Sequence, residues 1–170
     1  ENKVSKNNKI LPTLINTKID LQLDIGIPDA FFDSDLDKIN FYREIESLTH
    51  EVDLENLIAD FSVENNISET LPEEMENFFM LLKVKLKSSQ HLITQIKKVG
   101  INYQVDFKEN ITLEELKTFL DLDKEVKFVV TSTTRLRTPV KHFTNTENFL
   151  QYLLNLFNKK VGRTKIKLKK

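Results

Sequence analysis

The stretch IPDAFFDSDLDKINFYREIESLTHEVDLENLIADF, residues 27–61, is strongly acidic and has the pattern of a proline turn followed by two short amphipathic helices. Pro28 favours a turn, and the residues shortly after it include three whose side-chain oxygens can cap a first helical turn: Asp33, Ser34 and Asp35. Apolar residues then recur at the spacing of one helical face: Ile39, Phe41, Tyr42, Ile45 and Leu48. The stretch therefore predicts a turn followed by an amphipathic helix over residues 36–48.

A second short helix is predicted in the same stretch. Asp53 is expected to cap it, and its apolar stripe consists of Leu54, Leu57, Ile58 and Phe61. Helices this short are stable mainly because they pack. We therefore expect both helices to lie against further structure.

The flanking sequence predicts a strand on one side and a long helix on the other. An apolar residue at every second position is typical of a half-buried strand, and four residues show it: Ile19, Leu21, Leu23 and Ile25. Thr70 and Glu73 have the spacing of a capping box, with Pro72 in the first turn, and Gly100 can end a helix in the left-handed conformation. One long helix is expected between them, with an apolar stripe that continues to Ile96.

The second half predicts three more strands and two helices. Strands are expected over residues 101–107, 125–132 and 134–137, where apolar or β-branched residues dominate. Thr112 and Glu115 form another capping box, whose helix is expected to bury Leu113, Leu116, Phe119 and Leu120, and Thr146 is expected to cap the last helix. The predicted fold class is α+β: a single compact domain in which a small mixed or antiparallel sheet packs with a long central helix and several short helices.

Domain organisation follows from composition. Residues 1–17 are expected to be a linker from a parent chain, residues 18–160 the domain, and residues 161–170 a basic tail. The chain opens with Glu1 and its methionines are Met75 and Met80, so we expect it to be a piece of a longer protein. There is no cysteine and no apolar run approaching the ~20 residues that span a bilayer. A cytoplasmic location without membrane contact is expected.

The formal net charge of −1 hides a strong asymmetry. Residues 19–80 hold 17 acidic residues and only two basic ones, whereas residues 81–170 hold 19 basic and eight acidic residues. Such a separation concerns partners and orientation more than fold. The acidic half is expected to favour a basic protein surface.

Little catalytic equipment is visible. With three glycines at positions 26, 100 and 162, no glycine-rich loop is available to hold a phosphate. His50, His91 and His142 lack the short spacing of metal ligands, and the carboxylates look like helix-start and solvated residues. We expect no catalysis, cofactor or metal in this fragment; an enzyme would need a deep pocket with converging polar groups.

The exposed side of the second predicted helix is the candidate binding site. Glu55, Asp60 and Glu64 lie at helical spacing and can present carboxylates to arginines of a partner. A solvated acidic face is the alternative.

Basic residues supply a different candidate. The last twelve residues, KKVGRTKIKLKK, contain Arg163, Lys165 and Lys167, which can contact nucleic-acid phosphates. Arg135, Arg137 and Lys141 form a weaker basic group. No aromatic residue is interleaved in the tail for base stacking, so a solvated terminus is the alternative.

An ordered set of short matches runs from about residue 18 to residue 160. It comprises the strand IDLQLDI, Ile27-Pro28-Asp29, Phe41-Tyr42-Arg43-Glu44-Ile45, Asp53-Leu54, Leu71-Pro72, Gly100-Ile101, Thr134-Arg135-Leu136, and the last helix with Phe149 and Leu153. In this set the chain resembles the C-terminal domain of bacterial transcription-repair coupling factors. That family usually closes the second helix with Arg-Phe-Gly, whereas this chain has Glu64, Asn65 and Asn66, so its turn is expected to be built differently.

The resemblance implies a regulatory role. In that family the parent is an ATP-dependent DNA translocase, and the terminal domain holds no ATPase motif. It folds back on the parent's N-terminal UvrB-like module and masks the surface that recruits UvrA until the parent engages stalled RNA polymerase. The implied direct partner is that module, with UvrA and RNA polymerase reached through the parent, and Asp60 falls where the family is commonly acidic. Direct nucleic-acid binding by the basic half is the alternative function.

Overall fold

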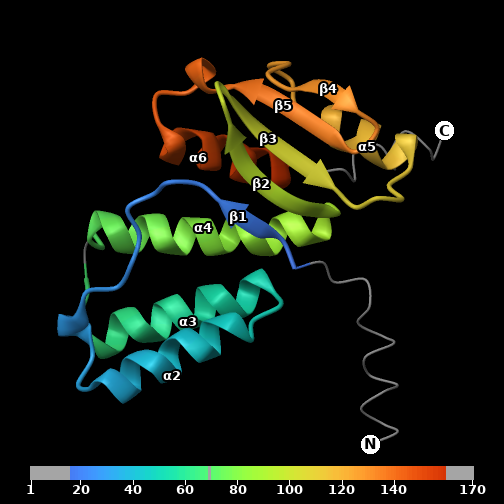
Figure 1. Cartoon of the computed structure of the whole chain (residues 1–170). Coiled ribbons are helices and arrows are strands. Elements are labelled where there is room, and N and C mark those ends of the chain that lie inside the picture. The colour runs from blue at the N-terminus through green and yellow to red at the C-terminus, as the bar shows by residue number, and fades with distance from the viewer. Residues whose placement is uncertain (1–15, 69, 160–170) are drawn as a thin grey trace, which may run out of the picture.

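A computed structural model describes residues 16–68 and 70–159, which form three layers (Figure 1). A five-stranded sheet is one outer layer. Helices α4 (Glu73–Gln90) and α6 (Thr146–Phe157) lie beneath it, and the two short helices of the opening stretch form the other outer layer. The predicted α+β domain with a long central helix is confirmed.

The sheet is mixed. Its spatial order is β1-β2-β3-β5-β4, where β1 pairs with β2 in parallel and the other neighbours are antiparallel. The strands are β1 (Lys18–Asp20), β2 (Ile93–Val99), β3 (Asn102–Phe107), β4 (Val129–Ser132) and β5 (Arg135–Pro139). One row of cross-strand partners faces the helices and consists of Ile19, Ile96, Val105 and Leu136.

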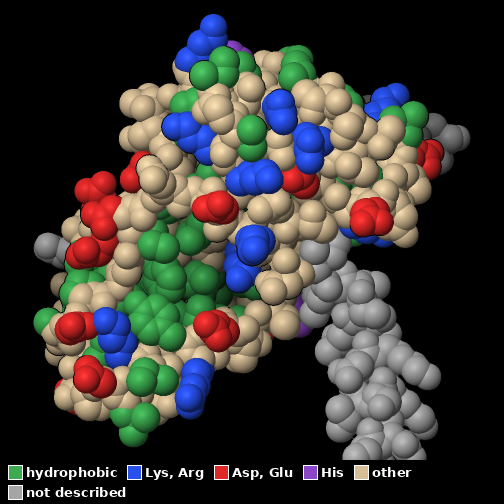
Figure 2. All heavy atoms as spheres, viewed as in Figure 1, with side chains coloured by type: hydrophobic (Ala, Val, Ile, Leu, Met, Phe, Trp, Pro, Cys, Tyr) green, Lys and Arg blue, Asp and Glu red, His purple; other side chains and the backbone are tan. Residues whose placement is uncertain are grey.

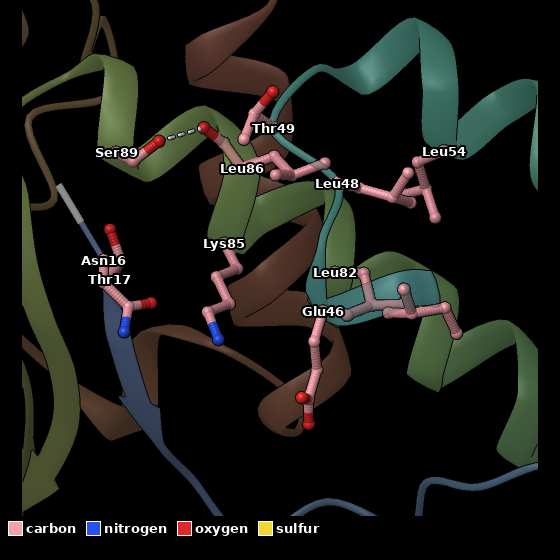
Figure 3. A pocket seen from close by; sticks show the side chains of 11 residues that line it. Asn16, Thr17, Glu46, Leu48, Thr49, Leu54, Leu82, Lys85, Leu86 and Ser89 are labelled. Atoms are coloured by element: carbon pink, nitrogen blue, oxygen red, sulfur yellow. Dashed lines mark hydrogen bonds between the residues drawn. The ribbon is translucent and has the colours of Figure 1, made fainter. Parts of the chain in front are cut away.

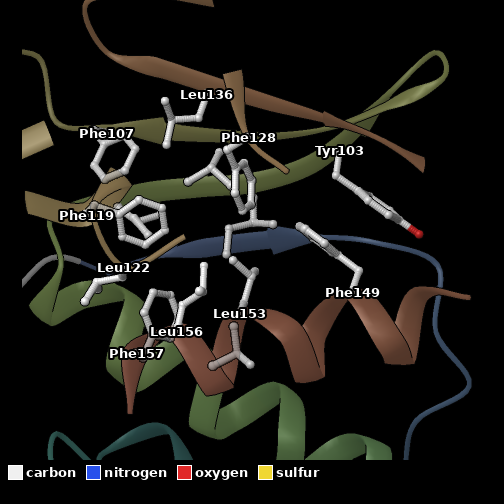
Figure 4. Close-up of a cluster of buried hydrophobic side chains, with 14 of the residues drawn as sticks. Tyr103, Phe107, Phe119, Leu122, Phe128, Leu136, Phe149, Leu153, Leu156 and Phe157 are labelled. Atoms are coloured by element: carbon white, nitrogen blue, oxygen red, sulfur yellow. The ribbon is translucent and has the colours of Figure 1, made fainter. Parts of the chain in front are cut away.

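The larger core lies between this face of the sheet and the helices α4, α5 (Leu113–Leu120) and α6 (Figure 4). Its centre is aromatic: the rings of Tyr103 and Phe149 stack with centroids 3.9 Å apart. The apolar stripe of α6 supplies Phe149, Leu150, Leu153, Leu156 and Phe157 to this core.

A second core joins α4 to the opening stretch. That stretch forms a short 3-10 helix, η1 (Asp29–Phe31), followed by α2 (Asp35–Glu46) and α3 (Glu51–Glu64). Phe61 of α3 is buried among aromatic rings, with centroid distances between 4.9 and 5.9 Å to Phe31, Phe32 and Phe41. The helix α4 contributes Met75 and Phe79 to this second core and Val84 to the larger core. It therefore lies between the two cores and contacts both of them.

The long helix is shorter than predicted. It ends at Gln90, and Ile93 to Val99 form β2 instead, while Gly100 (φ +61°) occupies the hairpin loop between β2 and β3. A β-bulge between Ile93 and Gln95 lets both Ile93 and Ile96 face the core. Two buried residues three positions apart imitate helical spacing, which explains the error.

Three predicted caps are wrong. Thr70 does not cap α4, because Leu71 precedes Pro72 and is therefore disfavoured in the helical conformation, so the helix begins only after the proline. The helix α3 begins after His50, which places Asp53 inside its first turn. Asn145 caps α6 by accepting from the Asn148 N–H at 2.8 Å.

Two other caps are confirmed. Ser34 accepts from the backbone N–H of Asp37, and Thr112 and Glu115 form the reciprocal capping box of α5. Leu113, however, is 79% exposed and does not point inward as predicted. It occupies the first turn of α5, whose buried side carries Leu116 and Phe119.

The first strand is also shorter than predicted, because the chain leaves the sheet after Asp20. It crosses the start of α4, where the N–H of Gly26 donates to the carbonyl of Glu74 at 3.1 Å. Leu21 and Leu23 pack against the larger core from this crossing segment, and Ile25 is exposed. The alternating apolar residues at positions 19–25 therefore belong to an extended segment, of which only the first part is a strand.

His91, just after α4, makes stability depend on pH. Its ring stacks on Phe157, with centroids 4.8 Å apart. Burial, and to a lesser degree the Lys87 ammonium, lowers the pKa of His91 below its ordinary 6.5. The unfolded chain therefore takes up this proton at higher pH than the folded chain, so the free energy of unfolding is expected to fall as the pH drops below about 6.5.

Urea unfolding at about pH 7.5 and about pH 5 measures this loss. The variant His91→Phe keeps a stacking ring without a titrating group, and its stability is expected to change less over the same interval. Equal losses in both proteins would contradict the assignment.

Candidate docking surface on helix α3

The three predicted partner-binding residues are all exposed on α3. Successive residues of a helix turn by about 100°, so Glu64 lies about 40° from Asp60, whereas Glu55 lies about 140° from it. The structure therefore brings Asp60 and Glu64 together on one edge of the exposed side and places Glu55 on the other edge.

An apolar line separates these two edges. Val52 is 59% exposed and Val63 is 77% exposed, and helical geometry places both opposite the buried residues Leu54 and Phe61. The surface formed by Val52, Glu55, Asn56, Asp60, Val63 and Glu64 is called the α3 face below. An apolar centre with a charged rim is the usual composition of a protein interface.

The carboxylates of the α3 face are available to a partner. Within residues 16–68 and 70–159, Glu55, Asp60 and Glu64 take part in no ion pair. Glu51, on the inner side of the same helix, instead pairs with Lys87 of α4 at 2.8 Å and fixes α3 against the layer above. The buried side of α3 is thus fixed to α4, while the carboxylates of the α3 face stay exposed.

The turn after α3 is closed by an asparagine. Asn66 adopts a left-handed conformation (φ 54°) and its N–H donates to the carbonyl of Val63, while the N–H of Ile67 donates to the carbonyl of Ser62 at 2.8 Å. These two bonds form a Schellman motif, in which glycine is the commonest residue and asparagine the usual substitute. Asn66 therefore supplies the left-handed residue that ends α3, a position at which glycine is most common.

The basic groups do not form a comparable site in the described residues. Arg137 and Arg135 on β5 use their Nε atoms to donate to Gln104 (2.9 Å) and Asp106 (2.7 Å) on the uncovered face of the sheet. Lys141 is exposed in the short helix η2 (Val140–His142). Arg163, Lys165 and Lys167 lie outside the described residues. Figure 2 shows basic side chains over the sheet, at the top of the view.

No group of three or more His, Asp or Glu side chains is placed to hold a metal ion within the described ranges. No described helix has the length and apolar character needed to cross a membrane. Val52 was not identified from the sequence as part of the docking surface. Val52 and Val63 lie three helical turns apart on the polar side of α3, and this spacing would have indicated an exposed apolar line.

Comparisons with known proteins place this arrangement in a family. The family model of the TRCF domain, which describes the sequences of that family, matches residues 21–117 of this chain. The crystal structure of the C-terminal domain of a transcription-repair coupling factor superposes with a TM-score of 0.71 and 17% sequence identity, over 93% of this chain and 98% of that one, which shows a shared fold. A comparison with curated proteins finds no match. Because the family model covers more than half of the sequence, the chain belongs to the TRCF domain family.

Proposed function

We propose that this chain is a non-catalytic regulatory domain of a transcription-repair coupling factor, and that it docks through the α3 face onto the N-terminal UvrB-like module of its parent. In the docked state it masks the surface that recruits UvrA. The observation that carries this proposal is the exposed carboxylate of Asp60, which lies beside the exposed Val63 near the end of α3. The opposite side of this helix is fixed to α4 by the ion pair between Glu51 and Lys87.

Physical chemistry supports docking to a basic surface. Exposed carboxylates at two edges of one helix can pair with arginines on both sides of a groove, and bidentate pairing fixes orientation. Burying Val52 and Val63 adds apolar contact at about 25 cal/mol per Å². Repression and release then correspond to two docked states whose populations shift when the parent binds RNA polymerase.

Charge reversal tests the docking surface. Asp60→Arg is expected to weaken binding of the chain to the UvrB-like module by about 10-fold, since like charges then face each other, and adding Glu55→Arg is expected to weaken it further. Isothermal titration with the separate module measures both affinities. Asp60 and Glu55 are exposed, so the fold is expected to persist, which circular dichroism checks.

Glu109→Arg is the matched control, because Glu109 is an exposed acid in the loop between β3 and α5. It makes the same change of net charge without altering the α3 face and is expected to bind normally. Unchanged affinity of the folded double variant would show that the α3 face is not the docking surface, and no binding by the unaltered chain would reject the docking itself.

A further inference from the structure

An apolar groove lies between α2, α3 and α4, on another side of α3 from the α3 face (Figure 3). It encloses ≈ 260 Å³ and its apolar lining consists of Ile45, Leu48, Leu54, Leu82 and Leu86. Figure 3 shows Leu48, Leu54, Leu82 and Leu86 among the side chains that line it. Apolar surface that stays in contact with water costs free energy and marks binding sites when it is contiguous.

The groove has a buried floor and a polar rim. Leu54 is fully buried and Ile45 is 6% exposed, whereas Leu82 and Leu86 on α4 are half-buried. Glu46 and Lys85 stand at the rim, and no ion pair joins them. The groove therefore fits an uncharged apolar segment flanked by polar or charged residues.

The described chain begins at the mouth of this groove. Asn16 and Thr17 line it, and the Thr17 hydroxyl donates to the carbonyl of Ile93 at 2.6 Å. Thr17 is almost completely buried, so this bond fixes the chain beside Ser89, which also lines the groove. Whatever precedes residue 16 therefore starts from a fixed point next to the apolar lining.

The preceding sequence matches the groove in chemistry and reach. Residues 10–15 read ILPTLI, with four large apolar residues and no charge, and Lys9 precedes them. The lining of α4 runs from Leu82 to Ser89, which is about 10 Å of helix, whereas six extended residues span up to about 20 Å. The segment is long enough to follow the groove from Asn16 toward Glu46.

We propose that residues 10–15 bind in this groove as an intramolecular strap, with Lys9 near Glu46. The tether favours this occupant over a second copy of the chain, because a short linker gives the attached segment an effective concentration in the millimolar range. The strap covers the apolar lining and sets the direction from which the N-terminal part of the chain approaches the domain.

The chain contains no cysteine, so two engineered cysteines can carry spin labels without background. Labels at Thr13→Cys and Glu46→Cys report the distance from the strap to the rim. Thr13 is the polar residue of the strap, and Glu46 is exposed. A narrow distribution of short distances is expected, and it is expected to be lost when Leu11→Ser and Leu14→Ser are added.

Val4→Ser is the matched control, since it removes an apolar side chain outside the strap and is expected to leave the distribution narrow. Circular dichroism verifies that each variant stays folded. A broad distribution in the labelled chain without the serine changes would overturn the proposal, as would a narrow one that survives both serine substitutions. A short distance in a mixture of the two singly labelled chains would show that a second copy occupies the groove, which also overturns it.

Discussion

Replacing Phe149 by alanine is expected to lower the free energy of unfolding by about 3–5 kcal/mol, the range for truncating a buried aromatic residue. Phe149 is fully buried where α6 meets the sheet, and its ring stacks on Tyr103 at an interplanar angle of 9°. Phe143 contacts its edge with centroids 5.2 Å apart. Alanine removes these contacts and leaves a cavity that the surrounding elements cannot close.

Urea unfolding followed by circular dichroism measures this loss. Val130→Ala serves as the control, because Val130 is 52% exposed on the edge strand β4 and its truncation is expected to change stability by less than about 1 kcal/mol. A similar small effect at Phe149 would mean that the layers are not held together at this point.

Asp123→Ala is expected to cost about 3 kcal/mol, since hydrogen bonds to a charged group contribute about 1.5–3 kcal/mol each. Asp123 is 5% exposed in the connection between α5 and β4. Its carboxylate accepts from the backbone N–H of Phe128 at 2.8 Å and from the Tyr152 hydroxyl. Alanine leaves the Phe128 N–H and the Tyr152 hydroxyl without this acceptor. It also removes the hydrogen bond that joins the α5–β4 connection to α6.

Burial, reinforced by the bond to Asp123, raises the pKa of Tyr152 above its ordinary value, so the hydroxyl remains a donor at neutral pH. Tyr152→Phe removes one of the two bonds and is expected to cost about half as much as Asp123→Ala. Asp121→Ala, at an exposed acid two residues away, is the matched control for both in the same urea titration. If Asp121→Ala and Asp123→Ala had equal effects, the buried carboxylate would not be structural.

Most elements could be predicted from local signals, and the failures have physical causes. The capping box at Thr112 works because helical residues follow it directly, whereas the same spacing at Thr70 fails because Pro72 excludes Leu71 from the helix. Ile93 and Ile96 are both buried although they are three positions apart, because a β-bulge lies between them. This bulge depends on the pairing of β2 with β3. Pairing partners lie outside any local window, so local periodicity could not distinguish this strand from a helix.

The candidate site was predictable in part for the same reason. Exposure of Asp60 and Glu64 follows from the apolar stripe of α3, and the turn of about 100° per residue already separates Glu55 from Asp60. The groove was not predictable, because its lining comes from three successive helices and from Asn16 and Thr17, and no local pattern gives the packing of these elements against one another. Only the assembled layers bring Leu48, Leu54 and Leu86 together.

The strand β1 also determines how the domain responds to mechanical force. It has three residues and pairs in parallel with β2 at the sheet edge, whereas in the sequence the helices η1, α2, α3 and α4 lie between these two strands. Tension applied through the N-terminal side loads this short pairing and the Thr17 bond before it reaches the antiparallel strands. β1 is therefore expected to detach at the lowest force, while α4 still connects the helical layer to β2.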